Sequence, residues 1–378
     1  MSLTFEQSSD MQTSFVTRAA RSIARTFPEH IPLYVCAVVF GAITLCVVKV
    51  FHVPLELDAG SFFLGLVLKF VALGAACASL YEFTQLIRGG FPQSPTRIIA
   101  SRLHGRFFSD DRIGNVFHSL IAFTPLMVSF AALKEVIPQV HPFVWDQTFM
   151  HWDRVIGFGR LPWEILQPVL GYPLITASLN FLYDSWFLIM FGGLFWQAFS
   201  ARGGEVRLQF LLAFSFAWFI AGNILATILS SAGPCFYGSL IHGSNPYAAQ
   251  MAYLHATAAH WPVWSVGLQD LLWQSYVRGD GQLGGISAMP SMHVTSTGLL
   301  MFVAWRTNRR LGIVLTIFTA LIVIGSVHLA WHYAVDGIAG LILATAFWLC
   351  AGAISRKWLR WIKARRVTLP AAVGALPV

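Results

Sequence analysis

The stretch LGIVLTIFTALIVIGSVHLAWHYAVDGIAGLILATAFWLC, residues 311–350, joins two long apolar runs through a short polar centre. Each run is about as long as the ~20 residues that an α-helix needs to cross the hydrocarbon core of a bilayer. The centre carries two histidines and an aspartate, which are costly inside a membrane and often functional there. This stretch therefore predicts two membrane-spanning helices with a reactive site at their junction.

The composition of the whole chain also indicates a membrane protein. Of its 378 residues, 56% are hydrophobic and only 11% are charged, whereas soluble domains carry about 25% charged residues. The net charge of +8 would suggest nucleic-acid binding in a soluble protein. Here the basic residues flank apolar runs, so we expect the lipid bilayer and a membrane lipid substrate as partners, and no nucleic acid.

We expect an all-α, polytopic membrane protein with about eight transmembrane helices. The long connections 138–172 and 231–289 are rich in tryptophan, which favours the headgroup level of a bilayer. Short interfacial helices are therefore expected there, for example in LPWEILQPVLGY, residues 161–172. The eight apolar runs, of which the sixth is the shortest, lie at 31–52, 62–86, 115–137, 173–197, 208–230, 290–305, 311–330 and 333–354.

The positions of the Lys and Arg residues predict the orientation. Most of the 25 basic residues lie at the same ends of these spans, including the segments before the first span and after the last. Because basic residues concentrate on the cytoplasmic side of a membrane, we expect both termini in the cytoplasm. The histidines then face the periplasm or lumen, and we expect a bacterial inner membrane.

Three residues near the end of the chain form a candidate catalytic group. His332 and Asp336 are four residues apart, so on a continuous helix they share a face and the carboxylate can fix the imidazole tautomer. This arrangement makes a histidine nucleophile or base. His293 follows Pro290 and Ser291 at the start of an apolar run. A helix start favours a bound phosphate, and a histidine beside it is placed to protonate a leaving oxygen.

The sequence PSMH (290–293) followed by HYAVD (332–336) resembles the second and third motifs of the type 2 phosphatidic acid phosphatase superfamily. Met292 stands where that superfamily has glycine, Gly325 and Ser326 replace its Ser-Arg pair, and its first motif has no match. These departures resemble the branch that contains fungal inositol phosphorylceramide synthase. The same branch is similar in three further stretches, SSAGPCFYG (230–238), WDRVIGFGRLPWEILQPVLG (152–171) and LNFLYDSWF (179–187).

The resemblance implies a six-helix catalytic core and a phosphoryl-transfer reaction. In the superfamily the residue matching His332 attacks phosphorus and becomes a phosphohistidine, the residue matching Asp336 orients it, and the residue matching His293 protonates the leaving group. We therefore expect a lipid phosphotransferase that moves a phospho-headgroup to an alcohol. A lipid phosphate phosphatase is the alternative. No metal and no organic cofactor is implied.

A bound phosphate needs positive partners, and position 326 carries no arginine. Arg278 is the only basic residue in the connection 231–289, so we expect it to bind the phosphate together with Ser291. Pairing of Arg278 with Asp280 or with a lipid headgroup is the alternative.

Four further polar residues are candidates for the cavity: His328, Asp184, Asn223 and Tyr237. For Asp184, pairing with Asn180 or Asn223 is an equal alternative. For His328, a structural hydrogen bond to a neighbour is the favoured alternative.

Two rival hypotheses remain for the histidine group. His328, His332 and Asp336 are spaced to suit a Zn or Fe site, although PSMH then has no role. A non-catalytic lipid transporter or scaffold is the rival from another class, although it has no need of the three residues.

The predicted spans divide the chain into four parts. These are a cytoplasmic N-terminal segment (1–30), two transmembrane helices with a cytoplasmic loop (31–114), the six-helix catalytic core (115–354) and a basic cytoplasmic tail (355–378).

Overall fold

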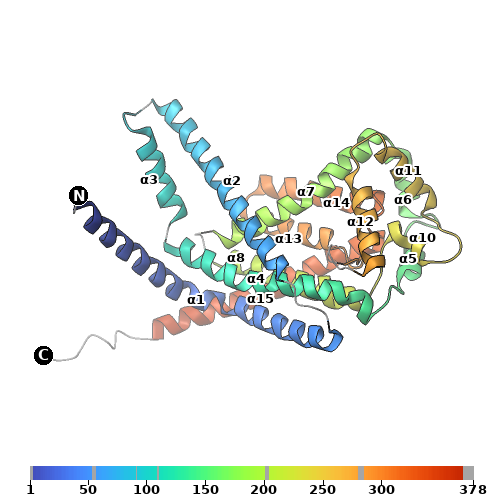
Figure 1. Ribbon diagram of the computed structural model, residues 1–378, viewed down its shortest axis with the longest axis horizontal. Helices are drawn as coiled ribbons and strands as arrows, with labels where there is room; N and C mark the ends of the chain where they lie inside the picture. Colours follow the sequence, from blue (N-terminus) through green and yellow to red (C-terminus); the bar gives the residue numbers. More distant parts are fainter. Residues whose placement is uncertain are drawn as a thin grey trace.

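The computed structural model describes residues 3–52, 57–90, 92–108, 110–200, 204–279 and 285–368. All regular secondary structure in these residues is helical (Figure 1). The elements are α1 (Leu3–Phe51), α2 (Asp58–Gly89), α3 (Pro95–Phe107), α4 (Asp110–Val140), α5 (Asp146–Ile156), α6 (Pro162–Leu170), α7 (Pro173–Ala198), α8 (Glu205–Phe216), the π-helix η1 (Ala217–Leu225), α9 (Ala226–Ile228), the 3₁₀-helix η2 (Pro234–Phe236), α10 (Tyr237–Leu240), α11 (Ala248–Ala258), α12 (Trp264–Arg278), α13 (Met292–Thr307), α14 (Arg309–His328) and α15 (Ala334–Thr368).

Seven helices of the described chain are long and apolar enough to cross a membrane, which confirms the all-α polytopic fold. They comprise α2, α7, α14, most of α1, α4 and α15, and the continuous segment from α8 to α9. The sixth expected span, 290–305, corresponds to α13, which has only 16 residues. Its length of about 24 Å falls short of the ~30 Å hydrocarbon core.

The start of α13 explains why this helix is short. The Ser291 hydroxyl oxygen accepts a hydrogen bond from the backbone N–H of Val294, so Ser291 caps the helix. Residues 285–291 before it are not helical, yet most of them are buried. Ala288 and Met289 donate their backbone N–H groups to the carbonyl and the hydroxyl of Ser231. Non-helical backbone is tolerated within a bilayer where other parts of the protein satisfy its hydrogen-bonding groups in this way.

The ends of the chain continue the membrane helices. The N-terminal segment 1–30, from residue 3 onward, belongs to the same helix as the first span, because α1 runs to Phe51 without a break. The basic segment 355–378 begins as the last turns of α15, and its residues 369–378 lie outside the described part of the chain. The expected interfacial helix in 161–172 is α6, which together with α5 fills the connection between α4 and α7.

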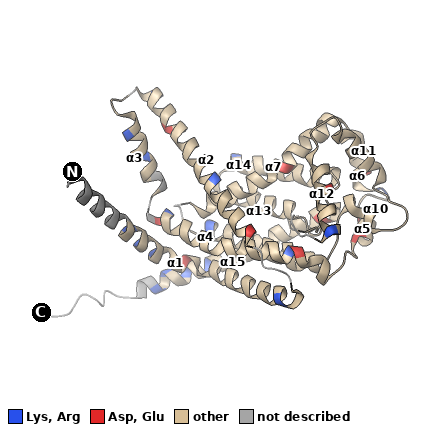
Figure 2. Ribbon diagram, viewed as in Figure 1, with Lys and Arg blue, Asp and Glu red and all other residues tan. Residues whose placement is uncertain are grey.

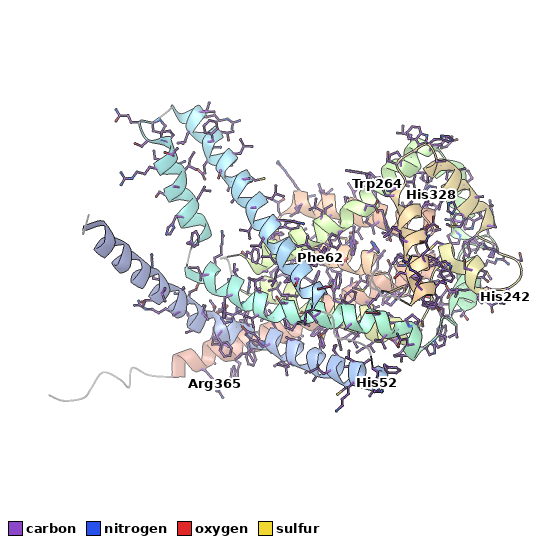
Figure 3. The ribbon with its side chains drawn as sticks, viewed as in Figure 1. His52, Phe62, His242, Trp264, His328 and Arg365 are labelled. Atoms are coloured by element: carbon purple, nitrogen blue, oxygen red, sulfur yellow. The ribbon has the colours of Figure 1, made fainter. Side chains whose placement is uncertain are left out.

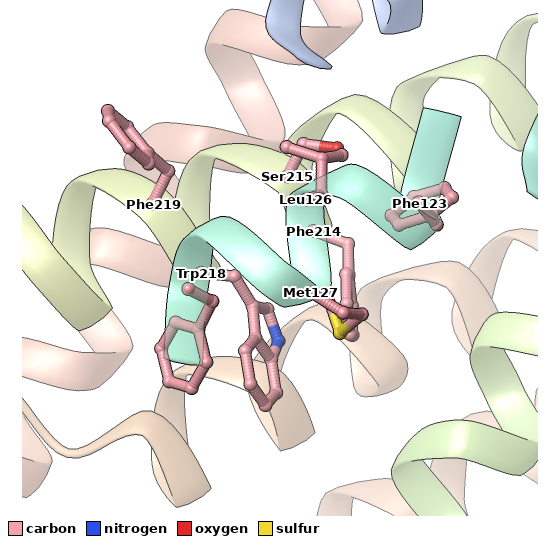
Figure 4. A pocket seen from close by; sticks show the side chains of 8 residues that line it. Phe123, Leu126, Met127, Phe214, Ser215, Trp218 and Phe219 are labelled. Atoms are coloured by element: carbon pink, nitrogen blue, oxygen red, sulfur yellow. The ribbon is translucent and has the colours of Figure 1, made fainter. Parts of the chain in front are cut away.

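The helix α8 lies at the centre of the bundle. Every residue from Arg207 to Ser215 is buried, and α8 packs against α1, α7, α13 and α15. A helix that is covered on all sides in this way is a core helix. Beside it, α4 and α8 enclose a void of only about 10 Å³ lined by apolar side chains such as Phe123 and Phe214 (Figure 4). This is about the space of one water molecule, so the core is closely packed.

The two ends of the bundle differ. The connecting helices α5, α6 and α10–α12 gather at one end, and the first turns of α1 and the last turns of α15 lie at the other (Figure 1). His328 and Trp264 lie at the first end and Arg365 at the second (Figure 3). Lys and Arg positions collect where α1 and the end of α15 approach each other (Figure 2). His328 and Arg365 therefore lie at opposite ends of the bundle.

Arg207 ties four helices together at the basic end. Its side chain is only 4% exposed. It donates to the backbone carbonyls of Gln197 and Ala198 at 2.9 and 3.0 Å, to Ser119 Oγ at 3.1 Å and to His30 Nε2 at 3.0 Å. These partners belong to α7, α4 and α1, so one guanidinium group fixes how the three helices meet α8.

Replacing Arg207 by alanine should lower the melting temperature of the purified protein in detergent. Several buried acceptors then lose their donor, which costs about 1–3 kcal/mol each, so we expect a decrease of roughly 2–6 °C or more. Arg309, exposed at the start of α14, supplies the control, and Arg309→Ala should melt like the wild type. Equal melting temperatures for the two variants would show that the Arg207 contacts do not stabilise the bundle.

Candidate active site

The turn between α14 and α15 holds His332 against Asp336. His332 Nδ1 lies 3.3 Å from Asp336 Oδ2, and the same oxygen accepts the backbone N–H of Tyr333 at 3.0 Å. The pair does not lie on one continuous helix, because α15 begins only at Ala334. Asp336 instead reaches back from the third helical position to the residue that caps the helix, as the acidic residue of a capping box does. The spacing of four residues brings the two side chains together by this route.

His293, at the start of α13, meets His332 from the other side. His293 Nδ1 lies 3.4 Å from His332 Nε2, and the two rings are 5.6 Å apart at 66°. The backbone N–H of Ser291 donates to the carbonyl of Asp336 at 3.2 Å, which links the start of α13 to the start of α15. The structure therefore brings His293, His332 and Asp336 into one line of hydrogen-bonding groups.

Two aromatic rings of α7 enclose the His293 ring. Tyr183 stacks on it at 4.5 Å and 22°, and Trp186 lies 4.0 Å away at 41°. Trp186 is held by a hydrogen bond from its Nε1 to Ser296 Oγ at 2.8 Å. Burial and the positive charge of Lys134 lower the pKa of His293 well below its ordinary value, and the two aromatic faces, which attract a neighbouring cation, act in the opposite direction. Tyr183 and Trp186 both lie in LNFLYDSWF, but the sequence did not single them out.

Lys134 is the basic residue whose charge acts on both histidines. It lies near the end of α4, and its positive charge interacts with His293 and with His332. The side chains of Lys134 and His293 are partly buried, whereas His332 and Asp336 are buried. The sequence places Lys134 in α4 without any link to the histidines, and only the fold brings it to the site.

The environment of His332 keeps its ring neutral. Burial lowers the pKa of His332 to about 3, the charge of Lys134 acts in the same direction, and a backbone hydrogen bond to Ala288 opposes both. A neutral imidazole whose Nδ1–H points to a carboxylate has its lone pair on Nε2. In this structure that Nε2 faces His293.

Arg278, the expected phosphate ligand, lies at the exposed end of α12. It is the last residue of that helix and its side chain is exposed, whereas the charge that acts on the two histidines comes from Lys134. Ser291 is fully buried and caps α13 beside His293. Phosphate binding by Arg278 therefore stays a prediction.

The other candidate residues have structural partners. His328 Nε2 bonds to Thr176 Oγ1 at 2.9 Å, which joins α14 to α7. Asp184 accepts a hydrogen bond from Asn180 at 2.7 Å. Asn223 is buried in the π-helix η1, where its amide reaches the carbonyl of Trp218 at 3.4 Å. Tyr237 is buried and packs edge-on against Tyr247.

The alternative of a metal site at His328, His332 and Asp336 is not formed. Within the described residues, no three or more His, Cys, Asp or Glu side chains are grouped so as to hold a metal ion. His328 points to Thr176 instead of towards the His332–Asp336 pair.

Comparison with known proteins identifies the family. No curated protein and no solved structure matches the chain. A family model described as the PAP2 superfamily matches residues 147–350, more than half of the chain. The matched range includes His293, His332 and Asp336 but begins after Lys134. This chain, with its three aligned side chains and its membrane helices, belongs to the PAP2 superfamily.

Proposed function

We propose that this protein is a lipid phosphotransferase that works through a phosphohistidine on His332. The observation that carries the proposal is the line of groups Asp336, His332 and His293, with the free nitrogen of the nucleophile facing the candidate acid. The lipid is of the phospholipid type, and an alcohol accepts the phospho-headgroup. Resemblance to the inositol phosphorylceramide synthase branch supports transfer to an alcohol over hydrolysis.

The first half-reaction uses all three side chains. The Nε2 lone pair of His332 attacks phosphorus, and an Nε2–P bond forms while the bond from phosphorus to the leaving oxygen breaks. Protonated His293 gives its proton to that oxygen. Asp336 holds the Nδ1–H of His332 and stabilises the positive charge that develops on the ring.

The second half-reaction reverses the proton transfer. Neutral His293 takes the proton from the hydroxyl group of the acceptor, whose oxygen then attacks phosphorus. A P–O bond forms and the Nε2–P bond breaks, which regenerates neutral His332. If water takes the place of the alcohol, the same steps release the phosphorylated product by hydrolysis. PAP2 superfamily membership favours this phosphatase activity as the second candidate function.

Lys134 is the proposed phosphate ligand in place of Arg278. Negative charge on the oxygens around phosphorus needs a positive partner in the transition state. Lys134 is the cation that interacts with both histidines. A lipid phosphate bound between His293 and His332 therefore lies within reach of its charge.

The distribution of basic residues supports an active site on the external face of a bacterial inner membrane. Arg25, Arg356, Arg360 and Lys363 line a cavity of about 550 Å³ at the end of the bundle opposite the histidines. Basic residues mark the cytoplasmic side, so both termini are proposed to be cytoplasmic.

Purified protein in mixed micelles with EDTA should form a phosphoenzyme with headgroup-labelled phospholipids. The label should be acid-labile and base-stable, as a phosphohistidine is, and His332→Ala should abolish it together with turnover. His255→Ala, which changes an exposed histidine on α11, is the matched control. A new headgroup-bearing lipid indicates transfer, and free phosphate or phosphorylated headgroup indicates hydrolysis. Undiminished turnover of His332→Ala would contradict the phosphohistidine mechanism, and a wild type without turnover on any lipid tested would support the non-catalytic hypothesis.

Lys134→Met should lower kcat/KM by about 100-fold or more, the usual cost of losing one stabilising partner of a transition-state oxyanion. Lys134→Arg should retain part of the activity because the charge remains. Arg278→Gln, on exposed α12, should stay within about twofold of the wild type. A large loss in Arg278→Gln with none in Lys134→Met would restore Arg278 as the phosphate ligand.

A further inference from the structure

The short helix α5 presents two carboxylates to the interior of the protein. Asp146, Phe149 and Asp153 are its buried residues and, at spacings of three and four, lie on one face. The exposed positions of α5 are mixed: Trp152 is 44% and Val155 64% exposed, and the polar residues Gln147, His151 and Arg154 are exposed as well. Two carboxylates buried in this way need hydrogen-bond donors inside the protein.

Asp153 takes up the first N–H groups of α15. Its Oδ2 accepts from the backbone of Ala334 at 2.9 Å and its Oδ1 from the backbone of Val335 at 3.0 Å. The first N–H groups of a helix have no partner within the helix, and a carboxylate near them is favoured by the helix dipole. These two residues lie between His332 and Asp336. Asp153 therefore fixes the backbone that sets the distance between the nucleophile and its orienting carboxylate.

Asp146 holds the other side of the same turn. It accepts the hydroxyl hydrogen bond of Tyr333 at 2.8 Å and the backbone N–H groups of Ala232 and Gly233 at 3.1 and 2.9 Å. A side chain at Gly233 would collide with the carbonyl of Trp331, so glycine lets this segment lie directly against the turn. Asp146 thus connects the catalytic turn to the segment before η2.

We propose that Asp153, assisted by Asp146, is a positioning residue that holds the His332–Asp336 turn in its reactive geometry. This positioning role rests on the proposed function, because the geometry of the turn is taken to serve phosphoryl transfer at His332. In the turn, the hydrogen bonds of the two aspartates go to the backbone of Ala334 and Val335 and to the hydroxyl of Tyr333, so both aspartates act on His332 through these groups. A displacement of the nucleophile by a fraction of an ångström is enough to slow attack.

Because the positioning role depends on the charge of Asp153, it should appear in the pH dependence of the activity. Burial raises the pKa of Asp153 to about 7, against its two backbone hydrogen bonds, and the charge of Asp336 adds to the increase. The titratable groups around it are Asp336 and His332 in the turn, Tyr247 before α11, and Asp146 and Arg154 on its own helix. Below pH 7 the protonated carboxyl group is a weaker acceptor for one of the two N–H groups. An asparagine at this position imitates that state at every pH.

Asp153→Asn should lower kcat and the rate of phosphohistidine formation by about 10- to 100-fold, as expected for one lost charge-assisted hydrogen bond. KM should change by no more than about twofold, because no contact to substrate is removed. The ratio of wild-type to variant activity should increase with pH through about 7. Hydrogen exchange of a peptide covering residues 330–340 should be faster in the variant.

Glu164→Gln is the matched control. Glu164 caps the neighbouring helix α6 by accepting the backbone N–H of Leu161 at 2.9 Å, so its hydrogen bond stays within α6 and its cap. This variant should lose a comparable helix cap and a comparable amount of thermal stability, and it should keep its kcat and its pH profile.

The outcomes separate this inference from the proposed function. An active wild type with an equally active Asp153→Asn would overturn the inference alone, whether or not exchange of 330–340 becomes faster. A loss of kcat that merely matches the loss of folded protein, with a constant ratio across pH, would reduce Asp153 to a structural role. A wild type that forms no phosphohistidine with any lipid would overturn the proposed function, and the inference with it.

Discussion

The buried turn before α15 is the constraint on which the rest of the structure depends. Leu329, Ala330, His332 and Tyr333 are buried and Trp331 is partly buried, so each backbone N–H must find an acceptor inside the protein. Trp331 and His332 donate to the carbonyl of Ser326, Tyr333 donates to Asp336, and the next two residues donate to Asp153. A helical hairpin buried in this way stays folded only if carboxylates are placed beside it. The same carboxylates define where the His332 ring lies.

The carboxylates beside the turn place negative charge close to the proposed phosphate site. Their position and their hydrogen bonds limit the electrostatic repulsion between them and an anionic substrate. Asp146, Asp153 and Asp336 lie behind the turn, where backbone N–H groups or a tyrosine hydroxyl occupy most of their oxygens. Lys134 and His293 are the more accessible groups. An anionic substrate therefore approaches a cation and a histidine held between aromatic rings, and meets the carboxylates only through the imidazole of His332.

Local sequence patterns predicted the helices and part of the site. Runs of about 20 apolar residues gave seven helices of spanning length, because in a bilayer the helix satisfies its own backbone. The sixth run was expected as another span but is a 16-residue helix. Its length depends on the cap at Ser291 and on hydrogen bonds to Ser231, which is remote in sequence. The Trp-Asp pairs at 145–146 and 152–153 repeat at a spacing of seven, and this was the available signal for an acidic inner face of α5.

The helical membrane fold, the His332–Asp336 contact and the link to a superfamily could be predicted from the sequence, because each depends on hydropathy or on residues close together in the chain. Which distant groups complete the site depends on how the helices pack. The packing brought the charge of Lys134 in α4 and the rings of Tyr183 and Trp186 in α7 to the histidines. It also left Arg278 exposed and paired His328 with Thr176. These outcomes follow from how helices far apart in sequence pack against each other, and no spacing within one segment encodes that packing.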